Sequence, residues 1–280
     1  MADRLRLLCV VAHPDDESFG FGGTLARYAA EGVETFVICA TRGQFGWPGD
    51  AGTNPGAEAL GRVRAGELRA AGAVLGVREI QLLDHLDGHL ARVSCAELQA
   101  EIARHIRRLR PQVVLTFGPD GDYGHPDHVA ISQATTAAIV TAVAHDALPD
   151  EVPETLTRHR VDKLYYLALT VKQAQLARQV FGDPVVHTDG VARRYHFVGY
   201  EAWYHTARLD VWSLFDVRWQ AGLCHQSQVA GFHLDNLTPE EKHRLWGQEC
   251  YYRAMCFLDV DTGRETDLFA GLRDTAGLEA

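Results

Sequence analysis

Short apolar runs alternate with helix-length segments along the first half of the chain, and this alternation restricts the fold more than any other feature. The runs are too short for helices and are mostly apolar, which is typical of strands buried on both faces. Strand, helix and strand in close succession form a right-handed crossover and predict parallel pairing. The expected strands are 5–11, 33–40, 79–83 and 112–117, and the expected helices are 19–31, 57–75, 94–109 and 126–145. We therefore expect an α/β fold with a doubly wound, mostly parallel sheet.

The second half of the chain has a weaker pattern. Residues 163–169 are typical of a fifth strand, and 211–228 and 239–253 have the apolar spacing of two late helices. The stretch 170–209 indicates only short β pieces and loops. We expect this half to form an irregular extension on the rim of the sheet.

Two dense polar clusters follow predicted strands. Residues 13–17 (His-Pro-Asp-Asp-Glu) come directly after the first strand, and 123–128 (Tyr-Gly-His-Pro-Asp-His) come after the strand at 112–117. Such a concentration of charge at the end of a buried strand is costly unless something compensates it, and a divalent metal ion is the simplest compensator. Carboxyl ends of strands flank the switch-point crevice of a doubly wound sheet, so we expect the two clusters to meet there.

The spacing of the polar residues suits one metal ion. His13 and Asp16 lie three residues apart on a strand-to-helix turn, and His128 supplies a third ligand from the second cluster. Two imidazoles and one carboxylate suit zinc in a site that keeps a position open for water and substrate. Ferrous iron fits the same ligands. The sequence thus predicts one Zn²⁺ per chain, with Fe²⁺ as the alternative.

A dinucleotide-binding domain is the first rival for this fold class. Gly20 and Gly22 follow the first strand, but the third glycine of the dinucleotide fingerprint would fall at Leu25. Thr41 and Arg42 stand where an acidic residue should end the second strand. We therefore exclude dinucleotide binding.

Bulk composition narrows the remaining classes. The 280-residue chain carries a formal charge of −10, whereas a nucleic-acid binder needs a basic face. No signal peptide or membrane-spanning run is visible, and the six cysteines show no metal-binding spacing, so we expect a cytoplasmic protein with reduced thiols.

The acidic, proline-containing stretch 146–153 is the expected boundary between an α/β metal-binding core (1–150) and a C-terminal part of the same domain (151–280) that adds a strand, helices and pocket loops. Homo-oligomer formation stays open.

Five stretches of the sequence are similar to the motifs of one known family. They are 12–17 (AHPDDE), 41–43 (TRG), 64–67 (RAGE), 123–128 (YGHPDH) and 225–228 (HQSQ). With these motifs in the same order, the chain resembles the zinc-dependent N-acetylglucosaminyl deacetylases of the PIG-L/LmbE type, which include the deacetylases of mycothiol and bacillithiol biosynthesis. The resemblance implies the Rossmann-like fold of that family. Gln44 is a departure, because relatives often carry glutamate after the TRG motif.

The resemblance implies a role for each polar residue of the two clusters. His13, Asp16 and His128 would be the metal ligands. Asp15 would be the general base that takes a proton from the attacking water. His125 would stabilise the tetrahedral oxyanion and protonate the leaving amine. Asp127 would orient His125 and raise its pKa, and Tyr123 would donate to the oxyanion.

Four further residues are candidates for substrate binding, each with a structural alternative. By the resemblance Arg64 holds sugar hydroxyls, although an arginine on a helix surface is an equal alternative. Asp87 would bind a sugar hydroxyl or form an Asp-Gly turn. Trp47 would stack on a sugar face or anchor its loop. His225 would line the pocket or cap a late helix.

The predicted function is zinc-dependent hydrolysis of the N-acetyl amide of an N-acetylglucosamine-type substrate, a small amino-sugar conjugate. One alternative is an amidase that cleaves a cysteinyl amide of a thiol conjugate. A second is a non-catalytic metal- or sugar-binding protein, although Asp15, His125 and Tyr123 are all present. A metallophosphoesterase would need more bridging carboxylates and a basic phosphate clamp, for which Arg42 and Arg64 are the only candidates.

Overall fold

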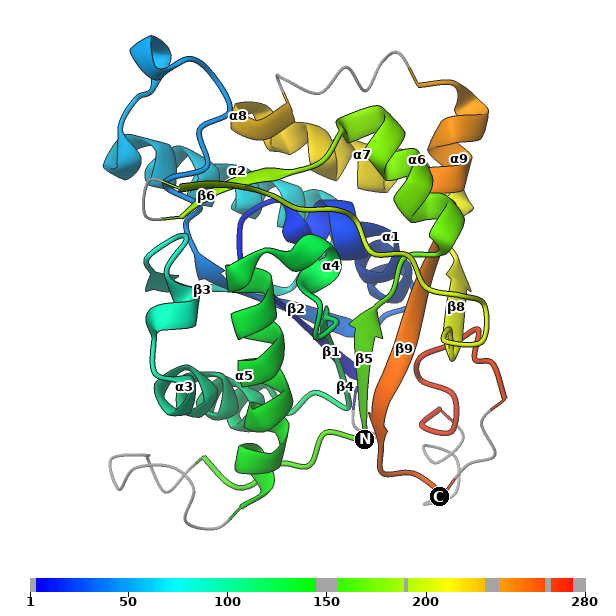
Figure 1. The fold of residues 1–280 in the computed structure, drawn as a ribbon. Coiled ribbons are helices and arrows are strands. Elements are labelled where there is room, and N and C mark those ends of the chain that lie inside the picture. Colours follow the sequence, from blue (N-terminus) through cyan, green and yellow to red (C-terminus); the bar gives the residue numbers. More distant parts are fainter. Residues whose placement is uncertain (1–3, 145–155, 189–190, 230–236, 260–262, 274–280) are drawn as a thin grey trace.

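The computed structural model describes residues 4–144, 156–188, 191–229, 237–259 and 263–273. Within these ranges a seven-stranded sheet lies between layers of helices (Figure 1). Its strands, in spatial order, are β3 (Glu79–His85), β2 (Glu34–Thr41), β1 (Arg6–Val11), β4 (Val113–Phe117), β5 (Lys163–Leu167), β9 (Gln248–Cys256) and β8 (Ala207–Asp210). The first five pair in parallel, β9 is antiparallel to β5, and β8 is antiparallel to β9. The predicted doubly wound, mostly parallel α/β sheet is confirmed.

The connections reverse direction across the sheet at β1. From β1 the chain runs through α1 (Asp16–Ala30) to β2 and through α2 (Ala57–Leu75) to β3. It returns through α3 (Cys95–Leu109) to β4, on the other side of β1, and then passes through α5 (Pro126–Val143) to β5. Right-handed crossovers that move in opposite directions place α1 and α5 on opposite faces. The loops after β1 and β4 therefore diverge and leave a crevice at the carboxyl ends of these strands.

The central strands β1 and β4 form a rigid, buried base for that crevice. Residues 7–11 of β1 and all of β4 are buried and carry no charged side chain. Leu8 of β1 pairs with Phe36 of β2 on one side and with Val114 of β4 on the other. Burial of this apolar surface fixes the strand ends from which the polar clusters project.

The region 170–209 contains a helix that the sequence analysis missed. Thr170 caps α6 (Val171–Phe181), and its side chain accepts from the backbone N–H of Gln173 while the Gln173 side chain accepts from the N–H of Thr170. After α6, β6 (Val185–Thr188) and β7 (Val191–Arg194) form an antiparallel hairpin. The expectation of only β pieces and loops was therefore wrong for residues 171–181.

The late helices are shorter than predicted. The helix expected over 239–253 ends at Trp246 as α9 (Pro239–Trp246), and β9 follows it. Tyr251 on β9 is fully buried, so packing of this strand against β5 outweighs its helical spacing. The helix expected over 211–228 is broken at His225, between α7 and α8. These two helices and the 3₁₀ turn before them are η3 (Trp212–Leu214), α7 (Phe215–Cys224) and α8 (Gln226–Val229).

Short turns complete the described elements: η1 (Ala51–Thr53), η2 (Leu90–Arg92) and α4 (Gly121–Gly124). The domain boundary predicted at 146–153 lies outside the residues that the structure describes. In the described ranges, none of the helices has both the length and the apolar character that crossing a membrane requires.

Candidate metal centre and active site

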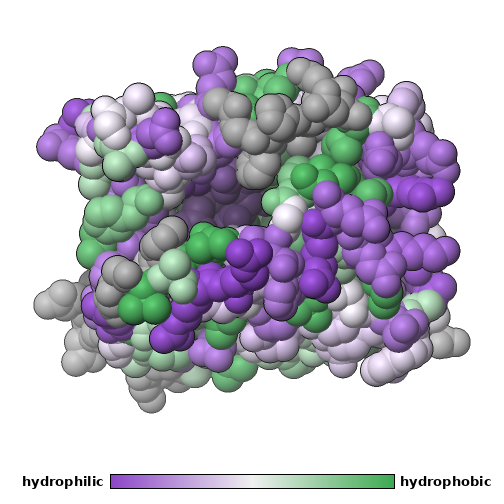
Figure 2. Space-filling view, turned by 45° about the horizontal axis from the view of Figure 1, so that its top comes forward, coloured by the Kyte–Doolittle hydropathy of each residue, from purple (hydrophilic) through white to green (hydrophobic). Residues whose placement is uncertain are grey.

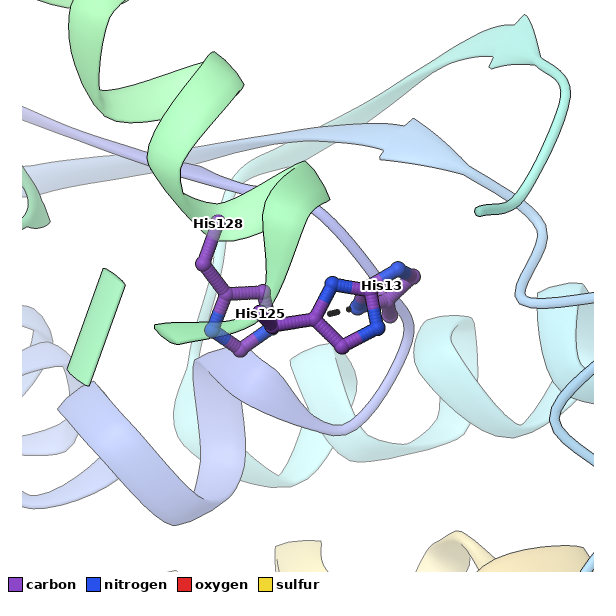
Figure 3. A group of neighbouring side chains, drawn as sticks. All are labelled: His13, His125 and His128. Atoms are coloured by element: carbon purple, nitrogen blue, oxygen red, sulfur yellow. Dashed lines mark hydrogen bonds between the residues drawn. The ribbon is translucent and has the colours of Figure 1, made fainter. Parts of the chain in front are cut away.

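The two polar clusters meet at the switch point of the sheet. His13 lies on the turn after β1, and His125 and His128 lie at the start of α5, after β4 (Figure 3). The Nδ1 atom of His13 is 3.2 Å from Nε2 of His128, and the ring centroids of His13 and His125 are 4.7 Å apart. Residues separated by more than a hundred positions thus form one imidazole cluster, as predicted.

Asp16 joins His13 and His128 as the third of three converging donor groups. Its Oδ2 atom lies 3.6 Å from Nδ1 of His13, and its Oδ1 atom lies 3.4 Å from Nε2 of His128. Ligands about 2.0–2.1 Å from a tetrahedral ion are separated by about 3.3 Å from each other, so these distances fit one ion of zinc's size. His13, His125 and His128 also lie close enough together to share an ion. The residues present therefore fit a divalent metal.

Hydrogen bonds behind the cluster leave the correct nitrogen atoms free for a metal. Nδ1 of His128 lies 3.2 Å from the carbonyl oxygen of Gly121, and Nε2 of His13 lies 3.2 Å from a carboxylate oxygen of both Asp87 and Asp127. A proton on each of these atoms leaves the lone pairs on Nε2 of His128 and Nδ1 of His13 facing each other. Burial lowers the pKa of His13, but its bonds to the two carboxylates raise it well above its usual value.

The Asp127 carboxylate lies behind His13 rather than His125, which differs from the predicted arrangement. It accepts hydrogen bonds from the backbone N–H groups of Gly88 and Leu90, at 2.7 and 3.0 Å. Asp127 bonds to the His125 ring through its backbone instead: the N–H of Asp127 donates to Nδ1 of His125 at 3.1 Å. His125 is therefore held with Nε2 as its protonated nitrogen.

Asp15 projects from the start of α1 beside the three donor atoms. Its backbone has φ of 112°, and its N–H donates to Oε2 of Glu17 at 3.0 Å. Its carboxylate lies 3.1 Å from the Arg64 guanidinium. Burial raises the pKa of Asp15 to about 6, although Arg64 opposes that rise. A carboxylate is thus held next to the candidate metal centre without belonging to the three converging donors.

Arg64 of α2 is buried and joins the turn after β1 to the loop after β2. Its guanidinium donates to the carbonyl oxygens of Pro14 and Gly43 as well as to Asp15. Gly43 has φ of 60°, and a Cβ atom there would collide with the guanidinium, which explains the glycine of the TRG motif. Arg64 is therefore not a surface arginine, and its bonds order Asp15 and the loop after β2.

The site opens into a cavity of about 790 Å³. Of the predicted substrate-binding residues, Arg64, Asp87 and Trp47 line it, as do Asp15, Tyr123 and His125. The Tyr123 ring packs edge-on against His128 with centroids 5.1 Å apart. Asp122 and Gln228, which are not among the candidates from the sequence, also line the cavity. Gln228 belongs to the quoted 225–228 motif, so the motif could have identified it as a cavity residue.

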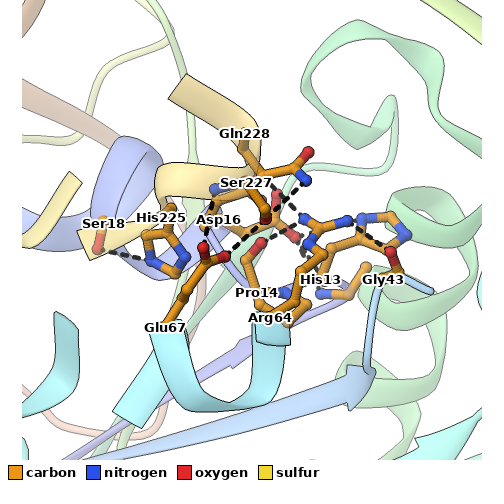
Figure 4. Close-up of polar contacts among 12 residues, drawn as sticks. His13, Pro14, Asp16, Ser18, Gly43, Arg64, Glu67, His225, Ser227 and Gln228 are labelled. Carbon is orange, nitrogen blue, oxygen red and sulfur yellow. Dashed lines mark hydrogen bonds and ion pairs between the residues drawn. The ribbon is translucent and has the colours of Figure 1, made fainter. Parts of the chain in front are cut away.

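His225 does not line the cavity, which corrects its predicted role as a substrate-binding residue. It is fully buried beneath the site, where its Nε2 atom lies 3.4 Å from Oγ of Ser18 (Figure 4). The same Nε2 atom lies 2.7 Å from Oε1 of Glu17. Two residues later, Ser227 donates from its N–H and hydroxyl groups to the Glu67 carboxylate. The 225–228 motif thus attaches α8 to α1 and α2, and Glu17 in turn holds the backbone of Asp15.

Replacement of His225 tests this attachment. His225→Ala leaves the Glu17 carboxylate buried without its cationic partner, and we expect a loss of about 3–5 kcal/mol in unfolding free energy. The matched control Ser227→Ala removes the hydroxyl hydrogen bond to the partly exposed Glu67, keeps the bond from the backbone N–H, and should cost about 1 kcal/mol. Urea unfolding measures the loss of unfolding free energy in both variants. Equal, small losses in the two variants would contradict a buried His225–Glu17 ion pair.

Comparisons with known proteins agree with the geometry. The family model for GlcNAc-PI de-N-acetylase (PIG-L) matches residues 8–139. A 1D-myo-inositol 2-acetamido-2-deoxy-α-D-glucopyranoside deacetylase of Kineococcus radiotolerans is 32% identical over 95% of this chain and 83% of its own. The mycothiol S-conjugate amidase of Streptomyces coelicolor is 30% identical over 99% of this chain and 100% of its own. Among solved structures, a conserved protein of Thermus thermophilus superposes with a TM-score of 0.62 and 27% identity over 91% of this chain and 97% of its own.

Proposed function

Because the chain belongs to the GlcNAc-PI de-N-acetylase (PIG-L) family, we propose that it hydrolyses the N-acetyl amide of an N-acetylglucosamine-type substrate to acetate and a free amine. The observation that carries this proposal is the convergence of His13, Asp16 and His128, with Asp15 beside them. Nδ1 of His13 and Nε2 of His128 are 3.2 Å apart, and each lies within 3.6 Å of one Asp16 carboxylate oxygen. Family membership and the donor set together indicate amide hydrolysis at a metal.

We assign the metal to His13, Asp16 and His128. Zinc suits two imidazoles and one carboxylate with open positions, and ferrous iron is the alternative. A bound divalent ion would polarise the amide carbonyl and lower the pKa of a water molecule beside it. Asp87 and Asp127 then act on the metal site indirectly, by fixing the orientation and tautomer of His13.

The surrounding side chains supply proton transfer and charge stabilisation. Asp15 takes the proton of the attacking water and can return it to the leaving amine, while Arg64 fixes the position of its carboxylate. His125, whose Nδ1 already accepts a hydrogen bond, donates from Nε2 to the oxygen that becomes negative. Tyr123 lines the cavity next to His125 and His128 and donates to the same oxygen.

The substrate-binding roles are assigned to residues that face the cavity. Trp47 is half-buried in the loop after β2 and would stack on a sugar face. Asp87 would accept a bond from a sugar hydroxyl, although it already accepts from the Phe45 N–H at 2.8 Å. We also propose a cytoplasmic location, since all six cysteines lie in the described ranges as free thiols.

An amidase acting on a cysteinyl amide of a thiol conjugate is the second candidate, because the Streptomyces coelicolor relative matches this chain over its whole length. Mass spectrometry of the products separates the two. The metal-loaded protein should release acetate from an N-acetylglucosaminyl-inositol and leave a mycothiol S-conjugate intact. Cleavage of the S-conjugate without acetate release favours the amidase, and cleavage of neither contradicts amide hydrolysis altogether.

A further inference from the structure

The cavity extends well beyond the metal centre, and its far side is apolar. Figure 2 shows a hollow with hydrophilic residues at its floor and hydrophobic residues along one side. That side, here called the apolar wall, is formed by α6, β6, α9 and the chain before β8. Its residues are Ala177, Phe181, Val186, Phe197, Leu245 and Trp246.

The apolar wall is continuous with a hydrophobic cluster between α6 and α9 at one end and with the candidate catalytic residues at the other. Leu245 and Trp246 of α9 pack with Ala177 of α6 in that cluster, so the wall has a rigid backing. At the other end, the Phe197 ring packs against Tyr123 with centroids 5.5 Å apart. A ligand that reaches from the metal centre past Tyr123 therefore meets hydrocarbon.

The polar groups interspersed with the wall are already engaged. The side-chain amide of Gln173 donates to the carbonyl oxygens of Leu245 and Gln248, at 3.2 and 2.9 Å. Arg218 and Glu249 form an ion pair of 2.8 Å. Because these groups are bonded within the protein, a polar ligand would gain little there and lose its hydration.

The size of the cavity indicates what part of a substrate reaches the wall. At about 790 Å³ it lies in the upper range of ligand pockets, which is more room than an N-acetylated sugar ring needs. The acetyl group and the sugar ring are fixed at the metal by the reaction itself. The aglycone is the part that remains to occupy the apolar side.

We propose that the apolar wall is a subsite for a hydrocarbon-rich aglycone of the amino-sugar substrate. This inference rests on the proposed deacetylase function and adds the chemical class of the group attached to the sugar. Burial of several methylene groups against the wall would strengthen binding of the substrate before and during reaction alike.

The test compares methyl and hexyl 2-acetamido-2-deoxy-α-D-glucopyranosides. We expect kcat/KM for acetate release to be at least about tenfold higher for the hexyl glycoside, mainly through a lower KM. Equilibrium binding to the metal-free protein should favour it by a similar factor. Equal binding of the two glycosides overturns the subsite. Acetate release from neither glycoside overturns the proposed function instead, so the two failures are distinguishable.

A third substrate and a pair of variants locate the effect. A methyl glycoside with an N-hexanoyl group tests the acyl side. A higher kcat/KM for this substrate, with no increase for the hexyl glycoside, overturns the assignment to the aglycone.

Val186→Gln, in β6, should lower the preference for the hexyl glycoside at least about threefold. Val191→Gln, on β7 of the same hairpin and outside the cavity lining, should keep the wild-type preference. Equal preferences in both variants would contradict the placement of the subsite.

Discussion

Asp15→Asn is expected to lower kcat for amide hydrolysis by about 10²–10⁴-fold, the usual contribution of a general base. The amide cannot accept the proton of the attacking water, but it retains an oxygen that can face Arg64. Asparagine also tolerates positive φ, so the backbone at 112° should persist. Because Asp15 lies outside the three converging donors, the variant should keep one metal ion per chain. Acetate-release kinetics and metal analysis on the same sample measure both effects.

Asp84 offers a matched control for this variant. It is also an aspartate with positive φ, 62°, at the carboxyl end of a strand, but it does not line the cavity. Asp84→Asn should therefore keep kcat within about twofold of the wild type, as expected for an exposed ion pair with Arg42. If Asp15→Asn retains more than a tenth of wild-type kcat, Asp15 is not the base.

His128→Gln is expected to weaken metal affinity at least about a hundredfold and to abolish activity at sub-micromolar free metal. Replacement of a residue that only supports a ligand already costs about 10–100-fold, so loss of the ligand itself should cost more. Glutamine fills most of the volume left where the imidazole stacks on Phe117, at 4.0 Å between ring centroids. Competition with a chromogenic chelator measures the affinity.

The control for His128→Gln is His105→Gln on α3. His105 does not line the cavity, and its replacement should leave metal affinity and activity unchanged. Full metal affinity in His128→Gln would show that the ion binds through other residues, such as His13 with Asp87 and Asp127, which also lie close together.

The sequence predicts those features that local pattern and motif spacing determine. Buried parallel strands appear as uninterrupted apolar runs, so β1, β2 and β4 were recognisable, and the switch-point rule then joined residue 13 to residue 128. β9 was not recognisable. Its aromatic residues fit helical spacing as well as a strand, and only pairing with β5 decides between the two.

Residues whose role depends on tertiary neighbours could not be assigned from spacing. His225 is one position of a motif, and nothing local shows that its partner is Glu17, 208 positions earlier. The Asp127 carboxylate lies behind His13 because the backbone N–H groups of Gly88 and Leu90 hold it there. The apolar wall draws on separate elements, and hydrophobic periodicity cannot distinguish a cavity lining from a filled core.

Titration of the metal-free protein with zinc, with acetate release followed at each addition, tests the central claim most directly. If His13, Asp16 and His128 form one catalytic metal site, release from an N-acetylglucosaminyl conjugate should rise in proportion to added zinc. It should reach its plateau at one equivalent per chain. Acetate release at full rate without metal, or none at any zinc level, would contradict a metal-dependent deacetylase.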